Sequence, residues 1–263
     1  MNTIKLLRGL APLALLLLLG PAIHAEERAQ SLSLSPAEVG ARGSFGQSVA
    51  VTFTMTNATE ATRSFELAAQ DVVVRDGRRI FIPADAEPRS IAATAVFSRE
   101  RLTIDPYTAA TVVARFTIPA GSDVRAVVVM FRATGVPRTA AGVLAVSGSL
   151  GALITFNLGD TVSLDAKRAS ITPPTAHGNL RVETLLANDG KEPLVPSGVV
   201  ALIDATGKLA AKSPIPPQRL LPGEHLPFVV ELPGRPAPGR YRALCTFSFE
   251  GRTVTTSSDF TLP

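Results

Sequence analysis

Apolar residues alternate with small or polar ones in many short segments of the chain, for example in residues 49–55, 112–118 and 226–232. Successive side chains of a β-strand point to opposite faces, so each segment fits a strand with one face in a core. The runs are punctuated by 21 prolines and 20 glycines, and few long segments have a helical period. The pattern predicts an all-β protein built from stacked antiparallel sheets.

A faint internal repeat divides the chain into two parts. In the first half, residues 49–57 form a strand that ends in Thr-Asn, and residues 102–106 lead into a second strand that ends in Ile-Pro. In the second half, residues 180–188 end in Ala-Asn, and residues 219–223 lead into a strand that ends in Leu-Pro. Copies about a hundred residues apart match the size of immunoglobulin domains. We therefore predict two tandem immunoglobulin-like antiparallel β-sandwiches, at residues 26–163 and 164–263.

The first 25 residues have the three-part layout of a signal peptide. Lys5 and Arg8 precede an apolar run over residues 10–19, and the small residue Ala25 follows a Gly-Pro break. The run is too short for a comfortable span of a hydrocarbon layer about 30 Å thick. We expect cleavage after Ala25 and an exported protein, periplasmic or associated with the cell surface, that has no stable membrane span after cleavage.

The net charge and the cysteine content limit the kinds of partner and chemistry that the sequence supports. Removing Lys5 and Arg8 from the 26 basic residues leaves 24 against 22 acidic ones, a net charge of +2. Without a dense basic run, nucleic acid is not an expected partner. Cys245 is the only cysteine, and it lies in the alternating series of residues 241–249. It is expected to be a buried core thiol, because apolar burial suits a small unpaired cysteine.

Few residues could carry catalysis or bind a metal. After cleavage the histidines are His177 and His225, far apart in the chain and each in turn-like sequence. They do not suggest a metal cage or a histidine-based triad, so we expect no catalytic, metal or cofactor residues and a non-enzymatic protein. A pair of carboxylates for glycoside hydrolysis stays open, because spacing alone does not show pairing. The candidates are Asp71, Asp105, Glu183 and Asp204.

The least strand-like stretch runs from Arg75 to Arg101. A tight turn is expected at residues 76–79, and one short helix near residues 91–97. Loops held on a rigid scaffold often carry binding residues, so Arg78 and Arg79 are candidate partner-binding residues.

Turn and strand-edge motifs recur along both halves, at residues 35–38, 56–59, 102–106, 118–119, 150–154, 188–190, 204–208, 221–223 and 238–241. In these motifs the chain resembles the WxL-interacting, peptidoglycan-binding surface proteins, whose extracellular part is a tandem of immunoglobulin-like domains. The resemblance implies an envelope or surface protein, or a cell-wall polymer, as the partner. The chain contains no tryptophan, and residues 95–97 read Ala-Val-Phe where that family has one. Tyr241 matches the tyrosine corner of immunoglobulin folds.

The chain also resembles periplasmic pilus chaperones, which have two immunoglobulin-like domains and bind clients through a strand at the end of the first domain. An apolar alternating series at that position consists of Leu150, Ala152, Ile154, Phe156 and Leu158. The alternative is an ordinary final strand that is fully paired in its own sheet. Lys167 and Arg168 follow the series and could anchor a client's terminal carboxylate, or form a solvated charge pair in a linker.

Three hypotheses follow from the sequence. The first is an exported, non-enzymatic envelope protein that holds a protein or cell-wall partner through sheet edges and the loop of residues 75–101. The second is a periplasmic chaperone for secreted or pilus-like subunits that acts by strand donation from residues 150–158. The third is a wall-polymer hydrolase that uses paired carboxylates.

Overall fold

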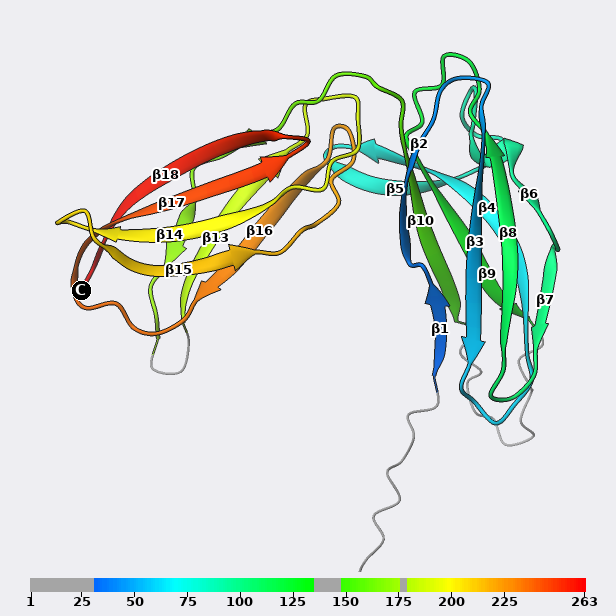
Figure 1. Ribbon diagram of the computed structural model, residues 1–263, viewed down its shortest axis with the longest axis horizontal. Coiled ribbons are helices and arrows are strands. Elements are labelled where there is room, and N and C mark those ends of the chain that lie inside the picture. The colour runs from blue at the N-terminus through cyan, green and yellow to red at the C-terminus, as the bar shows by residue number, and fades with distance from the viewer. Residues whose placement is uncertain (1–30, 135–147, 176–178) are drawn as a thin grey trace, which may run out of the picture.

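A computed structural model describes residues 31–134, 148–175 and 179–263, which form two β-sandwich domains (Figure 1). The strands of the first domain run at a steep angle to those of the second, and the β5 strand reaches from one domain toward the other. The predicted all-β class is confirmed. The expected signal peptide and its cleavage site lie outside the described residues, as does His177.

The first domain consists of two packed sheets and one turn of 3-10 helix. One sheet has the strand order β1-β3-β8-β6, and the other has the order β2-β10-β9-β4-β5, with β7 also paired to β4. The bounds are β1 (Leu32–Ser35), β2 (Glu38–Arg42), β3 (Ser48–Asn57), β4 (Arg63–Arg75), β5 (Arg78–Pro83), η1 (Ala92–Thr94), β6 (Val96–Phe97), β7 (Arg101–Ile104), β8 (Ala109–Thr117), β9 (Ala126–Thr134) and β10 (Ser149–Asn157).

The second domain also consists of two sheets. In one sheet β13 pairs with β11, β12 and β16, and the other has the order β15-β14-β17-β18. The bounds are β11 (Asp165–Ala166), β12 (Ser170–Thr172), β13 (Leu180–Ala187), β14 (Ser197–Asp204), β15 (Leu209–Ile215), β16 (His225–Leu232), β17 (Gly239–Phe249) and β18 (Arg252–Leu262).

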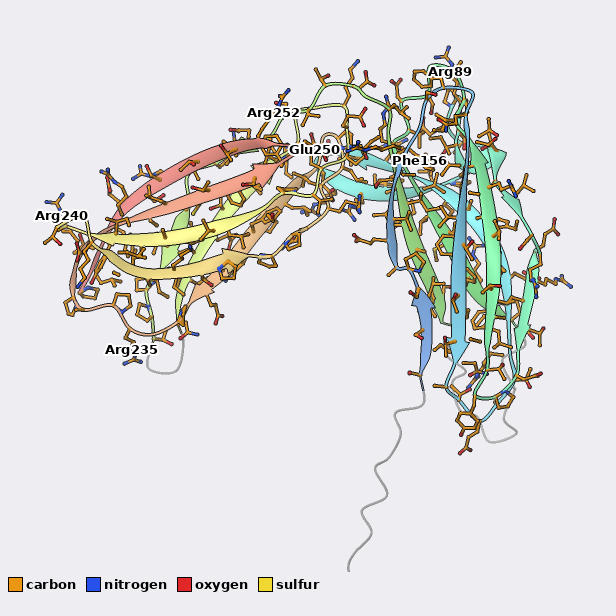
Figure 2. All side chains as sticks on the ribbon, viewed as in Figure 1. Arg89, Phe156, Arg235, Arg240, Glu250 and Arg252 are labelled. Atoms are coloured by element: carbon orange, nitrogen blue, oxygen red, sulfur yellow. The ribbon has the colours of Figure 1, made fainter. Side chains whose placement is uncertain are left out.

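Each domain has its own apolar core, built from the alternating positions that the sequence shows. In the first core, Phe53 and Phe131 meet edge to face, and so do Phe116 and Phe156. Figure 2 shows Phe156 in the first domain, whereas Arg240 lies at the far end of the second. Burial of this kind supplies most of the stability of a sandwich, at roughly 25 cal/mol per Å² of apolar surface.

Two sequence predictions for the second core are confirmed. Cys245 is fully buried, and burial raises the pKa of its thiol. The hydroxyl of Tyr241 donates a 2.7 Å hydrogen bond to the carbonyl of Ala237, which is the backbone contact expected of a tyrosine corner.

The segment from Arg75 to Arg101 is more regular than its composition suggests. Asp76 and Gly77 form the expected tight turn with positive φ angles, and it joins β4 to β5 as a hairpin. The prediction of a loop over residues 75–101 is therefore wrong for residues 78–83, because cross-strand pairing with β4 imposes an extended conformation. The expected helix is a single 3-10 turn, η1, followed at once by the β6 strand.

The two domains share a small apolar interface. Leu221 of the second domain packs into a buried cluster on the outer face of the β2-β10-β9-β4-β5 sheet, and its partners are Val72, Ala126, Val128 and Leu153. Leu221 is almost fully buried, although it lies in a loop. Polar contacts between the domains add to this apolar contact.

An ion pair joins the β5 hairpin to the second domain. The Nε atom of Arg79 lies 2.7 Å from a carboxylate oxygen of Glu224, whose side chain is 3% exposed. In return, the Nη1 atom of Arg219 donates a 2.6 Å hydrogen bond to the hydroxyl of Thr155, and its Nε atom lies 3.3 Å from the carboxylate of Glu38. Each arginine therefore reaches from its own domain to the other, and the two lie next to each other, since Arg79 also donates to the carbonyl of Arg219.

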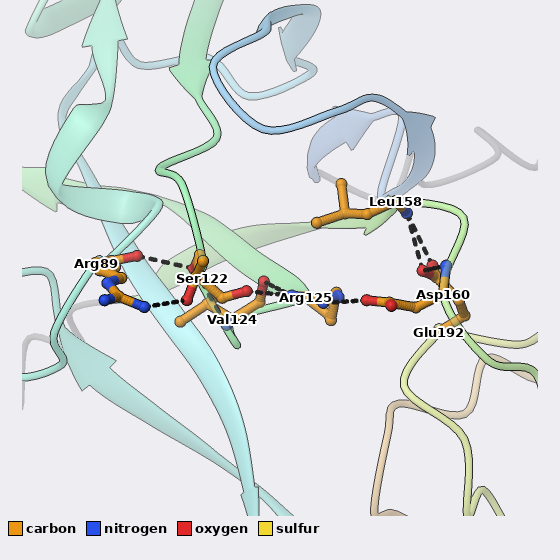
Figure 3. Close-up of polar contacts among 8 residues, drawn as sticks. Arg89, Ser122, Val124, Arg125, Leu158, Asp160 and Glu192 are labelled. Carbon is orange, nitrogen blue, oxygen red and sulfur yellow. Dashed lines mark hydrogen bonds and ion pairs between the residues drawn. The ribbon is translucent and has the colours of Figure 1, made fainter.

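A second polar network holds the connecting segment (Figure 3). The buried carboxylate of Glu192 accepts hydrogen bonds from the backbone amides of Leu158 and Asp160, the latter at 2.6 Å. The carboxylate of Asp160 in turn lies 2.7 Å from the Nη2 atom of Arg125, which is 7% exposed. Glu192 belongs to the second domain and Arg125 to the first, so the connecting segment is fixed at both ends.

Asp71 is a buried acid in the first domain. Its Oδ1 atom accepts a 2.9 Å hydrogen bond from the amide of Ala92 at the start of η1, while its Oδ2 atom has no hydrogen-bond partner. Burial raises the pKa of this carboxyl above its ordinary value, against the opposing effect of its hydrogen bonds. Asp71 therefore has a structural role: it holds η1 against β4, and this role explains why the carboxyl is buried.

The raised pKa of Asp71 predicts a pH-dependent difference between the protein and its Asp71→Asn variant. A carboxyl with a raised pKa favours folding below its unfolded pKa, and this advantage is lost as the pH rises through the folded pKa. The variant should therefore gain in unfolding free energy relative to the parent as the pH rises from 3.5 to 8. Urea denaturation of both proteins at several pH values checks this, and a constant difference would contradict it.

Loss of the Arg79 side chain should destabilise the interface between the domains. The Arg79→Ala variant leaves the Glu224 carboxylate buried without its cation, which costs about 3 kcal/mol in such pairs. The neighbouring exposed Arg78 is a matched control, and Arg78→Ala should change stability by less than about 0.5 kcal/mol. Urea denaturation followed by circular dichroism measures both, and equal effects of the two variants would argue against this role.

Candidate functional site

The alternating apolar series of the sequence analysis lies on β10. Ala152, Ile154 and Phe156 are fully buried in the first core, and Leu150 and Leu158 are half-buried against it. Their side chains already fill their own domain. Ile154 and Phe156 are part of the core of their own domain, and donation of these side chains to a client stays a prediction. The strand has only its backbone edge left to offer a partner.

Among the described residues, no strand pairs with that edge along the first half of β10. β9 pairs with β10 from Ser149 to Thr155, but β2 covers only Leu153 to Asn157 on the other side. The reason is a change of sheet: β1 pairs with β3 in one sheet, and after residues 36–37 the chain continues as β2 in the other. Residues 153–155 are paired on both sides, as the alternative of an ordinary final strand expects, whereas residues 149–152 pair only with β9 within the described part of the chain.

The hydrogen-bond pattern shows which backbone groups face this free edge. The amide of Leu153 bonds to the carbonyl of Ala37, toward β2, whereas the amide of Phe156 bonds to the carbonyl of Arg125, toward β9. Direction alternates along an antiparallel strand, so odd-numbered residues face away from β9. The amide and carbonyl groups of Ser149 and Gly151 therefore point to the free edge.

A groove with a volume of about 420 Å³ lies beside this edge on the outer face of the sheet. It extends from Ala37 across Gly151 and Met130 to Phe81 on the far strand. Phe81 is 54% exposed, which is unusual for a large aromatic side chain. A free strand edge and an exposed apolar groove are therefore adjacent on one domain.

A larger cavity of about 880 Å³ lies between the domains. Arg78 and Arg79, the candidates from the sequence, both line it, together with His225. Arg79 is engaged by Glu224, so its first role is to join the domains. Arg78 is exposed, and the amide of His225 donates to the carbonyl of Gly77 at 3.1 Å. This part of the β5 hairpin is therefore a domain contact.

The remaining candidates lie elsewhere. Lys167 and Arg168 connect β11 to β12 in the second domain, where the Nζ atom of Lys167 lies 2.6 Å from the carboxylate of Asp165. The next residue, Ala169, accepts a hydrogen bond from Ser258 on β18. The structure does not bring this pair to the free edge of β10, and binding of a client carboxylate by it stays a prediction.

The four carboxylates singled out for hydrolysis have other partners. Asp71 accepts from the amide of Ala92, Asp105 from the hydroxyl of Thr62, Glu183 from Arg181, and Asp204 from the residues of its own hairpin turn. In the described part of the chain, no group of three or more His, Cys, Asp or Glu residues is arranged to hold a metal ion. The hydrolase hypothesis thus gains no supporting observation, and the absence of catalysis stays a prediction.

The comparisons with known proteins give likenesses of fold at low similarity. No protein-family model matches the chain, and no curated protein sequence matches it. Among solved structures, a class 5 fimbriae chaperone (CfaA) matches with a TM-score of 0.46 and 12% identity, over 89% of this chain and 100% of that one.

Two further chaperone structures are similar to a comparable degree. The CsuC–CsuE complex of a chaperone and a tip adhesion subunit from Acinetobacter baumannii gives a TM-score of 0.43 at 9% identity, over 86% of this chain and 97% of that one. The CupB2 chaperone of Pseudomonas aeruginosa gives a TM-score of 0.39 at 12% identity, over 88% of this chain and 100% of that one. The neighbours thus include pilus chaperones, and the resemblance to WxL-interacting proteins finds no support. TM-scores this low carry no argument about function.

Proposed function

We propose that this protein binds an extended segment of an exported partner by adding it as a strand to the free half-edge of β10, as a chaperone for secreted or pilus-like subunits does. The observation that carries the proposal is the unpaired edge at residues 149–152, next to an open groove. Main-chain hydrogen bonds to such an edge are a general mode of peptide recognition. The proposal needs no catalytic step and no cofactor.

The edge limits the length of the bound strand. β2 occupies the position beside β10 from Leu153 onward, so an added strand has to end or turn away near Ala37. The two outward amides and two outward carbonyls of Ser149 and Gly151 would contribute about 0.5–1.5 kcal/mol each. Much of this is offset by the cost of ordering the segment, so the backbone alone gives weak binding.

Export and the location in the envelope remain part of this proposal. They rest on the signal peptide expected in residues 1–25 of the sequence. Among the described residues, no helix has the length and apolar character needed to cross a bilayer.

A proline at position 151 tests the proposal. The Gly151→Pro variant removes an amide that faces the free edge and leaves the pairing with β9 intact, because proline is tolerated where its nitrogen faces solvent. The probe is a fluorescein-labelled nine-residue peptide of alternating valine and threonine with alanine at its central position and lysine at its ends. In the Gly151→Pro variant, binding of this peptide, measured by fluorescence anisotropy, should weaken roughly two- to tenfold.

The control is Gly151→Ala, which keeps the amide and should bind the same peptide as the parent does. Circular dichroism and the melting temperature show whether each variant is folded. Ser149→Pro removes the second outward amide and gives an independent measurement. Unchanged peptide binding by both folded proline variants, or no binding by the parent protein, would overturn the proposed function.

A further inference from the structure

Gly151 lies both on the free edge of β10 and in the wall of the groove beside it. Its amide and carbonyl face the free edge, and its α-carbon forms part of the groove wall. A strand added beside β10 places one residue opposite Gly151, with its side chain on the same face of the sheet. That face is the outer one, where the groove lies. The partner residue opposite Gly151 is therefore the one whose side chain can enter the groove.

The absence of a side chain at position 151 keeps the entry to the groove open. A Cβ atom built on Gly151 would lie 3.1 Å from the Cγ2 atom of Val128 and 3.2 Å from the Sδ atom of Met130. These distances are closer than ordinary van der Waals contact. A side chain here would fill the passage between the free edge and the groove floor. Gly151 does not have a positive φ angle, so backbone conformation does not demand glycine at this position.

The chemistry of the groove determines which kind of partner side chain it can bind. Its two charged lining residues are neutralised, since Arg79 is paired with Glu224 and Glu38 lies 3.3 Å from Arg219. The remaining surface is mostly apolar, from Leu153 and Val128 through Met130 to the exposed ring of Phe81. Met130 is flexible and can adapt its shape to an occupant. A charged side chain would lose hydration here without gaining a partner.

We propose that this groove is a specificity subsite that takes one large apolar side chain, such as leucine or phenylalanine, from the partner residue opposite Gly151. The inference rests on the proposed strand addition and goes beyond it, because it assigns a preference to one position of the bound segment. The groove has room for such a side chain, at about 420 Å³. Burying a leucine or phenylalanine side chain there would strengthen the weak backbone binding by roughly tenfold or more.

The test uses four versions of the labelled peptide, with alanine, leucine, phenylalanine or lysine at the central position. The parent protein should bind the leucine and phenylalanine peptides roughly tenfold more tightly than the alanine peptide, and the lysine peptide no more tightly than alanine. Gly151→Val keeps the outward amide but fills the passage, so this variant should still bind the alanine peptide and lose the preference. Phe81→Ser removes the far wall and should reduce the preference severalfold.

The outcomes separate the two proposals. If the alanine peptide binds but leucine and phenylalanine add nothing, the subsite is wrong and strand addition stands. A preference that survives in both folded variants would also overturn the subsite. If none of the peptides binds to the parent protein, the proposed function fails, and the subsite fails with it. Phe81 is exposed, so the Phe81→Ser variant should fold and decide the matter even where Gly151→Val does not fold.

Discussion

β2 pairs with only the second half of β10, and the candidate site depends on this constraint. The chain begins the first domain as an edge strand of one sheet and crosses within a few residues to the edge of the other. Because of this crossing, β1 adds to one sheet and β2 to the other, and β2 covers only part of β10. Unpaired strand edges are a liability that proteins cover, shorten or charge. An edge left open beside an apolar groove is therefore a feature that calls for a functional explanation.

The second domain contributes by fixing the surroundings of this edge. Leu221 covers one end of the apolar outer face, and the sheet surface beyond it continues into the groove. Arg219 and Glu224 reach from the second domain and neutralise the charges at the groove margin. The same contacts that set the domain orientation thus leave an uncharged apolar surface next to the free backbone groups. Glu192 and Asp160 hold the connecting segment and limit rotation of one domain against the other.

The sequence predicted the features that arise from local alternation and turn chemistry. The double sandwich, the buried Cys245, the tyrosine corner and the turn at Asp76 and Gly77 were all accessible in this way. The alternation of residues 150–158 correctly marked a strand, but a period of two does not show whether the neighbouring edge is occupied. That depends on β2, which lies more than a hundred residues earlier in the chain.

The interface residues were missed for a related reason. Arg79 looked like a surface residue of a loop, and nothing in its local sequence points to Glu224 in the other domain. The motif at residues 150–154 places Gly151 in a strand and indicates nothing more about it. An isolated glycine within a strand pattern indicates a bulge or a close approach of another backbone. That signal was present in the sequence and could have directed attention to this position.

The most direct test of the account is residue-resolved amide hydrogen exchange along β10, measured by NMR on the protein without a ligand. Exchange reports whether an amide is hydrogen-bonded in the folded state. The account predicts alternation: the amides of Ser149 and Gly151 exchange rapidly, while those of Leu150 and Ala152, which face β9, are protected. Uniform protection of all four amides would mean that the edge is already paired, and would contradict the proposed mode of binding.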